Sequence, residues 1–189
     1  MRKVIKIILA IFAALIILTV VFGAIVVLDV AAYTATGAQT LTPTGTSVGK
    51  AIVIYDPGLS GTSKTVANQI GTDLQAQNYL VTLAGVKSSA AANTTGYSII
   101  VIGGPVYAGA LTNSVKDALS NVVLSNGQGA KVGIFGSGQG TTSPDDIAQL
   151  KQSIPTRSDN SLSDAVVVKI GSNEDLNTRA LDFVNQLIQ

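Results

Sequence analysis

Three short segments of this sequence combine glycine with small or hydroxyl side chains, and each follows an apolar run typical of a buried strand. Ligands of open α/β sheets bind beyond the carboxyl ends of the strands, so these segments are the candidates for a binding site. Backbone N–H groups and hydroxyls in such turns bind anions, and the dipole of a following helix adds partial positive charge. The first segment leads into a predicted helix and suits a phosphate monoester. The segments are 60–64 (SGTSK), 105–109 (PVYAG) and 137–140 (SGQG).

The absence of two residue types excludes several kinds of catalytic and metal-binding site. The chain has no cysteine and no histidine, which excludes disulfides, thiolate nucleophiles, imidazole bases and the usual zinc ligands. A serine hydrolase is disfavoured because no histidine could activate Ser60, Ser63 or Ser137. The first segment also lacks the spacing GxxxxGK[ST] of nucleotide triphosphatases and the GxGxxG of dinucleotide sites. We therefore predict no catalytic residue and no metal site.

The balance of charge argues against a nucleic-acid partner. The net charge is +1, and residues after 49 carry nine basic and ten acidic side chains. Phosphate backbones are bound by clustered lysine and arginine, and residues after 49 contain no basic run.

An apolar segment near the N-terminus predicts a membrane anchor. Residues 7–28 carry no charge, and 22 helical residues span about 33 Å, enough to cross the hydrocarbon core of a bilayer. The alternative is a cleaved signal peptide with small residues at Ala31 and Ala32, but apolar cores of signal peptides are usually about 7 to 15 residues long. Basic residues precede the segment, so the positive-inside rule keeps residues 1–6 cytoplasmic. We expect a single-pass protein of the cell membrane with an extracytoplasmic domain.

Two further regions follow the apolar segment. Residues 29–49 are rich in Thr, Gly and Ala with almost no large apolar side chain, which predicts a flexible tether. Residues 50–189 form the predicted soluble domain.

Within this domain, β-rich apolar runs alternate with helical stretches, the pattern of parallel strands joined by crossover helices. The expected strands are 51–55, 79–83, 98–102, 131–135 and 165–170. The expected helices are 63–77, 111–124, one that begins at the N-cap Ser143, and 174–188. The helix 111–124 would place Val115, Leu119, Val122 and Val123 on one side and end at Asn126-Gly127. Residues 84–97 are too short and polar for a full crossover helix, so we expect a brief turn or loop.

The glycine-rich segments resemble the flavodoxin family. Ser60-Gly61-Thr62-Ser63 resembles T-G-x-T, part of the phosphate loop [ST]-x-T-G-x-T of that family, although Thr62 can also be aligned with the last threonine. Residues 97–111 (YSIIVIGGPVYAGAL) are similar to the third strand and following loop, (D/Y)xxIIGSPxYxG. Residues 136–140 (GSGQG) look like the loop after the fourth strand. The resemblance covers about residues 50–189.

This resemblance implies an α/β, flavodoxin-like, doubly wound sheet of five parallel strands in the order 2-1-3-4-5. Together with the apolar segment, it gives a predicted architecture of one transmembrane helix followed by this domain. It also implies FMN as the cofactor, with Tyr107 as the residue that would stack on the flavin ring. The cofactor-binding residues implied are Ser60, Gly61, Thr62, Ser63, Lys64, Pro105, Val106, Tyr107, Ala108, Gly109, Ser137, Gly138, Gln139 and Gly140.

Three functions stay open at this point. The first is a membrane-tethered electron-transfer protein that exchanges electrons with an unidentified redox protein or a quinone. The second is a non-catalytic surface module that has kept the fold and lost the flavin, because the first loop departs from the family motif and the domain is not acidic. The third is a flavodoxin-like, quinone-linked oxidoreductase.

Overall fold

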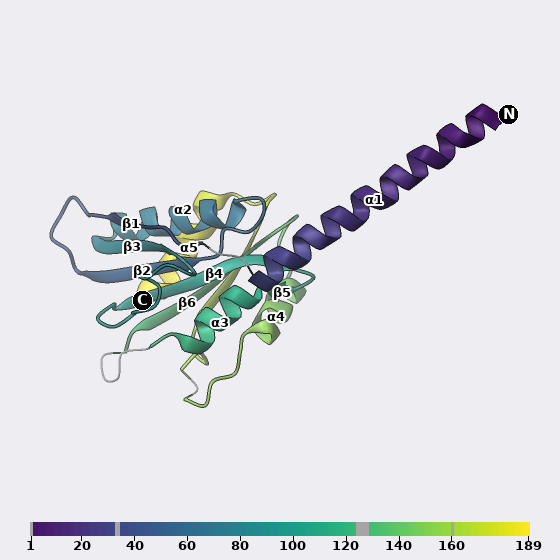
Figure 1. Ribbon diagram of the computed structural model, residues 1–189. Helices are drawn as coiled ribbons and strands as arrows, with labels where there is room; N and C mark the ends of the chain where they lie inside the picture. The colour runs from purple at the N-terminus through teal and green to yellow at the C-terminus, as the bar shows by residue number, and fades with distance from the viewer. Residues whose placement is uncertain (1, 33–34, 124–128, 160) are drawn as a thin grey trace.

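The structure, a computed structural model, describes residues 2–32, 35–123, 129–159 and 161–189. A twisted sheet lies between two layers of helices, and one long helix projects away from this domain (Figure 1). One face of the sheet is covered by α2 (Thr62–Ala76) and α5 (Leu176–Ile188). The other face is covered by α3 (Asn113–Asn121) and α4 (Pro144–Ser153).

Five parallel strands form the centre of the sheet. Their spatial order matches the predicted order 2-1-3-4-5. Most residues of these strands are buried because helices cover both faces, which explains their nearly continuous apolar runs. In spatial order the strands are β3 (Tyr79–Gly85), β2 (Gly49–Tyr55), β4 (Ile99–Tyr107), β6 (Lys131–Gly138) and β7 (Val166–Gly171).

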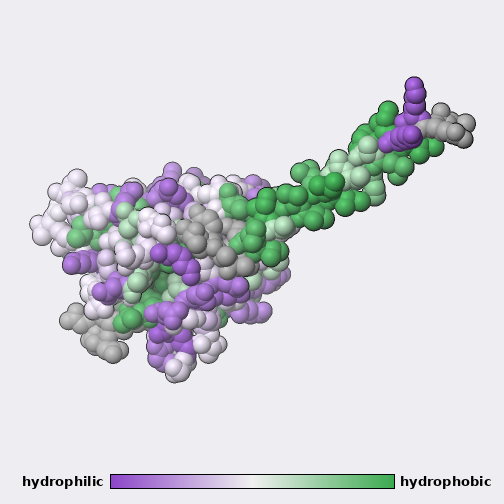
Figure 2. Space-filling model, viewed as in Figure 1, coloured by the Kyte–Doolittle hydropathy of each residue, from purple (hydrophilic) through white to green (hydrophobic). Residues whose placement is uncertain are grey.

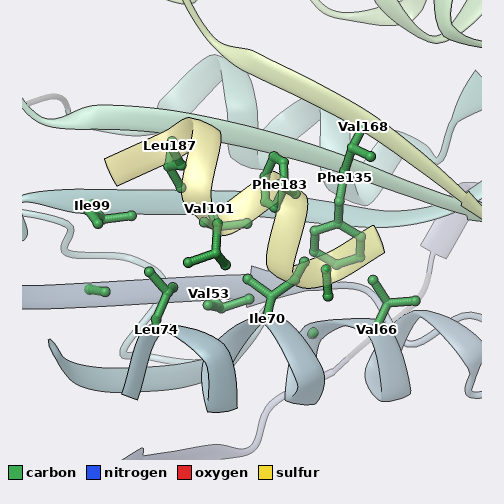
Figure 3. Close-up of a cluster of buried hydrophobic side chains, with 14 of the residues drawn as sticks. Val53, Val66, Ile70, Leu74, Ile99, Val101, Phe135, Val168, Phe183 and Leu187 are labelled. Carbon is green, nitrogen blue, oxygen red and sulfur yellow. The ribbon is translucent and has the colours of Figure 1, made fainter. Parts of the chain in front are cut away.

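Two apolar cores, one on each face, hold the layers together. Figure 3 shows the core beneath α2 and α5, where Ile70 and Phe183 lie against the sheet residues Val101 and Phe135. The second core joins α3 and α4 to the opposite face through residues such as Ile102 and Leu119. These cores fix the strands, so the carboxyl ends of β2, β4 and β6 lie at one edge of the sheet.

The predicted tether differs from the structure in one part. Residues Ala38–Leu41 form an edge strand, β1, which pairs antiparallel with β3 from Ala38 opposite Ala84 to Leu41 opposite Val81. Leu41, the one large apolar side chain of that segment, packs against the core beneath α2. Main-chain pairing and this single anchor are enough to order the strand.

Two strands are longer than expected and extend into the predicted site. β6 includes Gly136, Ser137 and Gly138, which we predicted to lie in a loop, because these residues stay paired with β4 or β7. β4 continues through Pro105, Val106 and Tyr107, residues that we predicted to lie in a loop. It then turns back into β5 (Ala110–Leu111), which pairs antiparallel with its end. Ala108 and Gly109 link the two strands with φ angles of 49° and 82°, the left-handed conformations of a two-residue type I′ turn.

The helices agree with the expectation to within about two residues except at the end of α3, and Leu111, the expected start of α3, lies in β5 instead. That helix ends at Asn121, so Val123 lies beyond it and is 52% exposed rather than facing the core. The predicted end at Leu124 and the stop signal Asn126-Gly127 lie outside the described residues. The predicted start of α4 is confirmed, because Ser143 is the N-cap and forms a capping box with Asp146. Residues 86–98 form turns with no helix, as expected.

The long N-terminal helix, α1 (Arg2–Ala32), is apolar around its whole circumference over most of its length. Figure 2 shows a continuous hydrophobic surface along this helix, with hydrophilic residues near its N-terminal end. The stretch Lys3–Leu28 is long and apolar enough to cross a membrane.

Candidate functional site

The first loop joins β2 to α2 and presents hydroxyls at the start of that helix. Gly61 is the N-cap residue of α2, with a φ angle of 73° and no side-chain cap. The hydroxyls of Ser60 and Thr62 are 2.9 Å apart, and the Thr62 backbone N–H donates to Ser60 Oγ over 3.3 Å. Both side chains are exposed, so the positive end of the α2 dipole is bordered by hydroxyls that reach solvent.

The three predicted segments, two of which lie largely in the ends of β4 and β6, meet around one cavity of about 100 Å³ at the carboxyl edge of the sheet. Eight of the predicted site residues line it. They are Ser60, Thr62, Pro105, Val106, Tyr107, Ser137, Gly138 and Gln139. Ser172, which follows β7, also lines the cavity and was not predicted. Its position directly after a buried strand is the same signal that identified the other turns.

The remaining six predicted site residues do not line this cavity. Ser63 is buried and shares a hydrogen bond of 2.5 Å with the Ser137 hydroxyl, which ties α2 to the end of β6. Gly61 and Lys64 line a separate hollow beside residues 35–37.

The last three predicted residues support turns rather than the cavity. Ala108 and Gly109 form the hairpin turn, and a Cβ on Gly109 would collide with Gln149 of α4. The Gly140 N–H donates to Ser172 Oγ over 3.1 Å, which joins the turns after β6 and β7.

Tyr107 extends from the end of β4 toward the first loop. A Cβ placed on Gly58 would lie 3.5 Å from the Tyr107 hydroxyl oxygen and 2.9 Å from Pro105 Cγ. Gly58 has a φ angle of 64°, so both its backbone conformation and this close approach require glycine. The aromatic ring of Tyr107 therefore lies at the wall of the cavity between the first loop and the hairpin.

A buried carboxyl group that the sequence analysis missed holds the first loop in place. Asp56 follows β2 and is fully buried. Its Oδ1 accepts from the Gly58 N–H at 3.0 Å, and its Oδ2 accepts from Thr112 Oγ1 at 2.8 Å and from Ser114 Oγ. Thr112 and Ser114 stand at the start of α3, where the helix dipole favours a carboxylate. Asp56 thus connects the first loop to the helix that follows the hairpin.

Charged side chains on the β7 side of the cavity form an ion pair. Lys169 lies within β7 and is 7% exposed, and its Nζ is 2.7 Å from Asp146 Oδ1 at the start of α4. The hydrogen bond from Lys169, together with those from the Ser143 backbone and hydroxyl, lowers the pKa of Asp146 to about 2. A Cβ on Gly138 would lie 3.1 Å from Lys169 Cε, so this lysine packs directly against the carboxyl end of β6.

Glu174 fixes the turn after β7 in a similar way. Its Oε2 accepts from Thr142 Oγ1 and from the Gly171 N–H, both at 2.6 Å. Burial raises the pKa of Glu174, but these hydrogen bonds and the Arg179 guanidinium outweigh burial and leave the pKa below its ordinary value. The acidic groups on this side are therefore ionised at neutral pH and engaged in structural contacts.

The donor chemistry of the cavity fits FMN, whereas its volume is small. Hydroxyls of Ser60 and Thr62 at a helix N-terminus suit a phosphate, and Tyr107 offers an aromatic surface to a flat ring. Ligand pockets usually enclose about 300 to 1,000 Å³, against about 100 Å³ here. FMN would therefore require the turns or Tyr107 to move outward.

Comparisons with known proteins identify the fold. No protein-family model and no curated protein sequence matches the chain. Among solved structures, oxidised flavodoxin 2 from Bacillus cereus is similar with a TM-score of 0.53 and 20% identity, over 74% of this chain and 97% of that one. The flavodoxin of Streptococcus pneumoniae TIGR4 gives 0.53 and 17% over 74% and 97%. A short-chain flavodoxin associated with a bacterial microcompartment gives 0.51 and 19% over 74% and 95%. The chain therefore has a flavodoxin-like fold.

Proposed function

We propose that this protein binds FMN in the cavity at the carboxyl edge and acts as a membrane-tethered electron-transfer protein. The observation that carries the proposal is that the first loop and the carboxyl ends of β4 and β6, distant in sequence, line a single cavity. That edge is where open α/β sheets bind their ligands. The similarity to flavodoxins supports the fold on which the proposal depends.

The roles of the residues follow from their positions. Ser60 and Thr62, with the N-terminal amides of α2, would bind the phosphate of FMN. Tyr107 would border the flavin ring, and Ser137, Gly138 and Gln139 would line its other side. Bound FMN supplies the redox chemistry, while the protein orients it and limits its access to water.

Tethering would set the place of reaction. We propose that α1 anchors the chain in the cell membrane, with its basic N-terminus cytoplasmic and the domain extracytoplasmic. An anchored domain has a raised effective concentration toward partners in the same membrane. The partner would be a redox protein or a quinone; with a quinone as the substrate, the protein would be a quinone-linked oxidoreductase.

A titration of the full-length protein in detergent with FMN tests the cofactor. Binding is measured by quenching of flavin fluorescence. Thr62→Val should weaken binding at least about tenfold, because a hydrogen bond to a charged group contributes about 1.5 to 3 kcal/mol. Thr72→Val is the matched control, since Thr72 is an exposed threonine elsewhere on α2. Full-length protein is needed because removing residues 1–49 would also remove β1.

The alternative function is a binding module that has lost the flavin. Two observations favour it: the small cavity and the pairing of Ser63 with Ser137, which engages two of the predicted site hydroxyls with each other. A folded full-length protein that leaves FMN fluorescence unchanged at high protein concentration would favour this module and contradict the electron-transfer proposal.

A further inference from the structure

The chain enters the domain at the carboxyl edge of the sheet, the same edge that carries the candidate cavity. The Gly85 N–H donates to the Gly37 carbonyl over 2.7 Å, and the Lys87 N–H donates to the Ala35 carbonyl over 2.8 Å. Gly85 is the last residue of β3, so these bonds fix residues 35–37 at the carboxyl end of that strand. β1 then runs antiparallel to β3, away from this edge. In Figure 1, α1 accordingly leaves the domain at the end where β4 passes into β5.

We call residues 35–37 the attachment, because they fix the chain to the domain at this edge. Few residues separate the attachment from the apolar stretch of α1. That stretch ends at Leu28, and the helix continues to Ala32. Four helical residues advance about 6 Å, and three residues from Ala32 to Ala35 reach at most about 11 Å. The headgroup layer on each side of the hydrocarbon core is itself about 5 to 7 Å thick. If α1 spans the bilayer, Ala35 is therefore held close to the lipid headgroups.

The surface next to this attachment has the composition of a lipid-facing patch, which we define as Leu59, Lys64 and Lys87. Leu59 stands in the first loop and is 47% exposed, and it lines a hollow together with Lys64 and residues 35–37. Lys64 and Lys87 are exposed, and Lys87 is bonded directly to the attachment. An apolar side chain flanked by lysines suits the boundary between headgroups and acyl chains, where lysine also attracts anionic lipids.

We propose that the carboxyl edge of the sheet rests on the bilayer surface, with the lipid-facing patch in contact with the headgroups. The inference depends on the proposed anchoring by α1. Because the candidate cavity lies at the same edge, the cavity faces the membrane, and its redox partner is reached from the bilayer rather than from bulk solvent. That consequence also rests on the proposed FMN site.

Single fluorescent labels in membrane vesicles test the orientation. The chain has no cysteine, so Leu59→Cys and Val48→Cys each give one labelling site. Val48 is exposed and precedes β2 at the opposite edge, about 20 Å away along a seven-residue strand. Each full-length protein is reconstituted into phosphatidylcholine vesicles with a minor fraction of phosphatidylglycerol, with and without lipids that carry a nitroxide on the headgroup.

We expect the label at position 59 to be quenched several-fold more than the label at position 48. Lys87→Cys should match position 59, which guards against a local effect of replacing Leu59. Equal quenching at both edges, or stronger quenching at position 48, would overturn the proposed orientation. Protein that fails to float with the vesicles would overturn the anchoring and the orientation together. FMN titration of the unlabelled protein reports the cofactor site separately, so failure of either proposal is distinguishable.

Discussion

The two sides of the candidate cavity use polar residues differently. On the β2 side, the first loop offers neutral hydroxyls, with Ser60 and Thr62 exposed to solvent. On the β7 side, Lys169 is paired with Asp146, and Glu174 is held by Thr142 and Gly171. The charged groups hold the ends of the strands in place, whereas the neutral donors of the first loop remain accessible to a ligand. Substitutions on the two sides should therefore change different properties.

Asp56 is the strongest test of this comparison because it is a structural carboxyl group on the side of the neutral hydroxyls. Asp56→Ala leaves three buried donors without their acceptor, so we expect the free energy of unfolding to fall by about 3 to 5 kcal/mol. Asp56→Asn, which keeps an acceptor oxygen, should lose less. Urea unfolding of the full-length protein in detergent measures both. A loss below 1 kcal/mol in Asp56→Ala would contradict the structural role.

The buried hydroxyl pair gives the next largest effect. Ser63→Ala leaves the Ser137 hydroxyl without its partner and should lower the free energy of unfolding by about 1 to 3 kcal/mol. The double variant Ser63→Ala/Ser137→Ala should cost little more than the single one, since both polar groups are then gone. Urea titrations of the wild type, both single variants and the double variant give the free energies of unfolding for this double-mutant cycle. Fully additive losses would show that the two hydroxyls do not act as a pair.

A substitution in the hairpin turn between the two sides should raise the free energy of unfolding, unlike the two preceding substitutions. Ala108 has a φ angle of 49° and an exposed side chain, and a left-handed conformation costs an L-residue about 1 to 2 kcal/mol. Ala108→Gly should therefore raise the free energy of unfolding by up to about 1 kcal/mol, after the greater unfolded-state entropy of glycine is included. Ala92→Gly, at an exposed turn alanine without positive φ, should lower it.

The smallest effect concerns the ion pair on the β7 side and depends on pH. The pKa of Asp146 is lowered to about 2, so its contribution is present above the ordinary aspartate pKa and is lost as pH falls toward 2. Lys169→Met should reduce stability at pH 7 and flatten its fall between pH 5 and 2. The effect is modest because 30% of the Asp146 side chain is exposed. Parallel stability curves for the two proteins would rule out this contribution.

The five strands of the central sheet could be predicted from the sequence because each is a buried strand encoded by an apolar run. Pro105 to Tyr107 were misplaced in a loop, since the two glycines before them resemble a turn. In fact β6 pairs with β4 as far as Pro105, and β5 pairs with Val106 and Tyr107. The edge strand β1 was missed because its stability comes from main-chain bonds and one leucine, which leave almost no periodic pattern.

The candidate site was predictable to a smaller extent. Strand order brought the three predicted segments to one edge, but side-chain direction decides which residues line the cavity, and Ser63 bonds to Ser137 instead. Asp56 and Lys169 were missed although each left a signal. An acid directly after a buried strand, or a lysine inside the run VVVKIG, requires a polar partner because unpaired burial is costly.

The position of the attachment also determines what proteolysis would leave behind. Every strand of the sheet, including β1, begins after Gly37, while α1 ends at Ala32. If α1 anchors the protein as proposed, a single cut between Ala32 and Ala35 would release a fragment that retains every strand the structure describes. Membrane-bound and shed forms would then differ in location and share one architecture, so a protease could change where the protein works without altering how it folds.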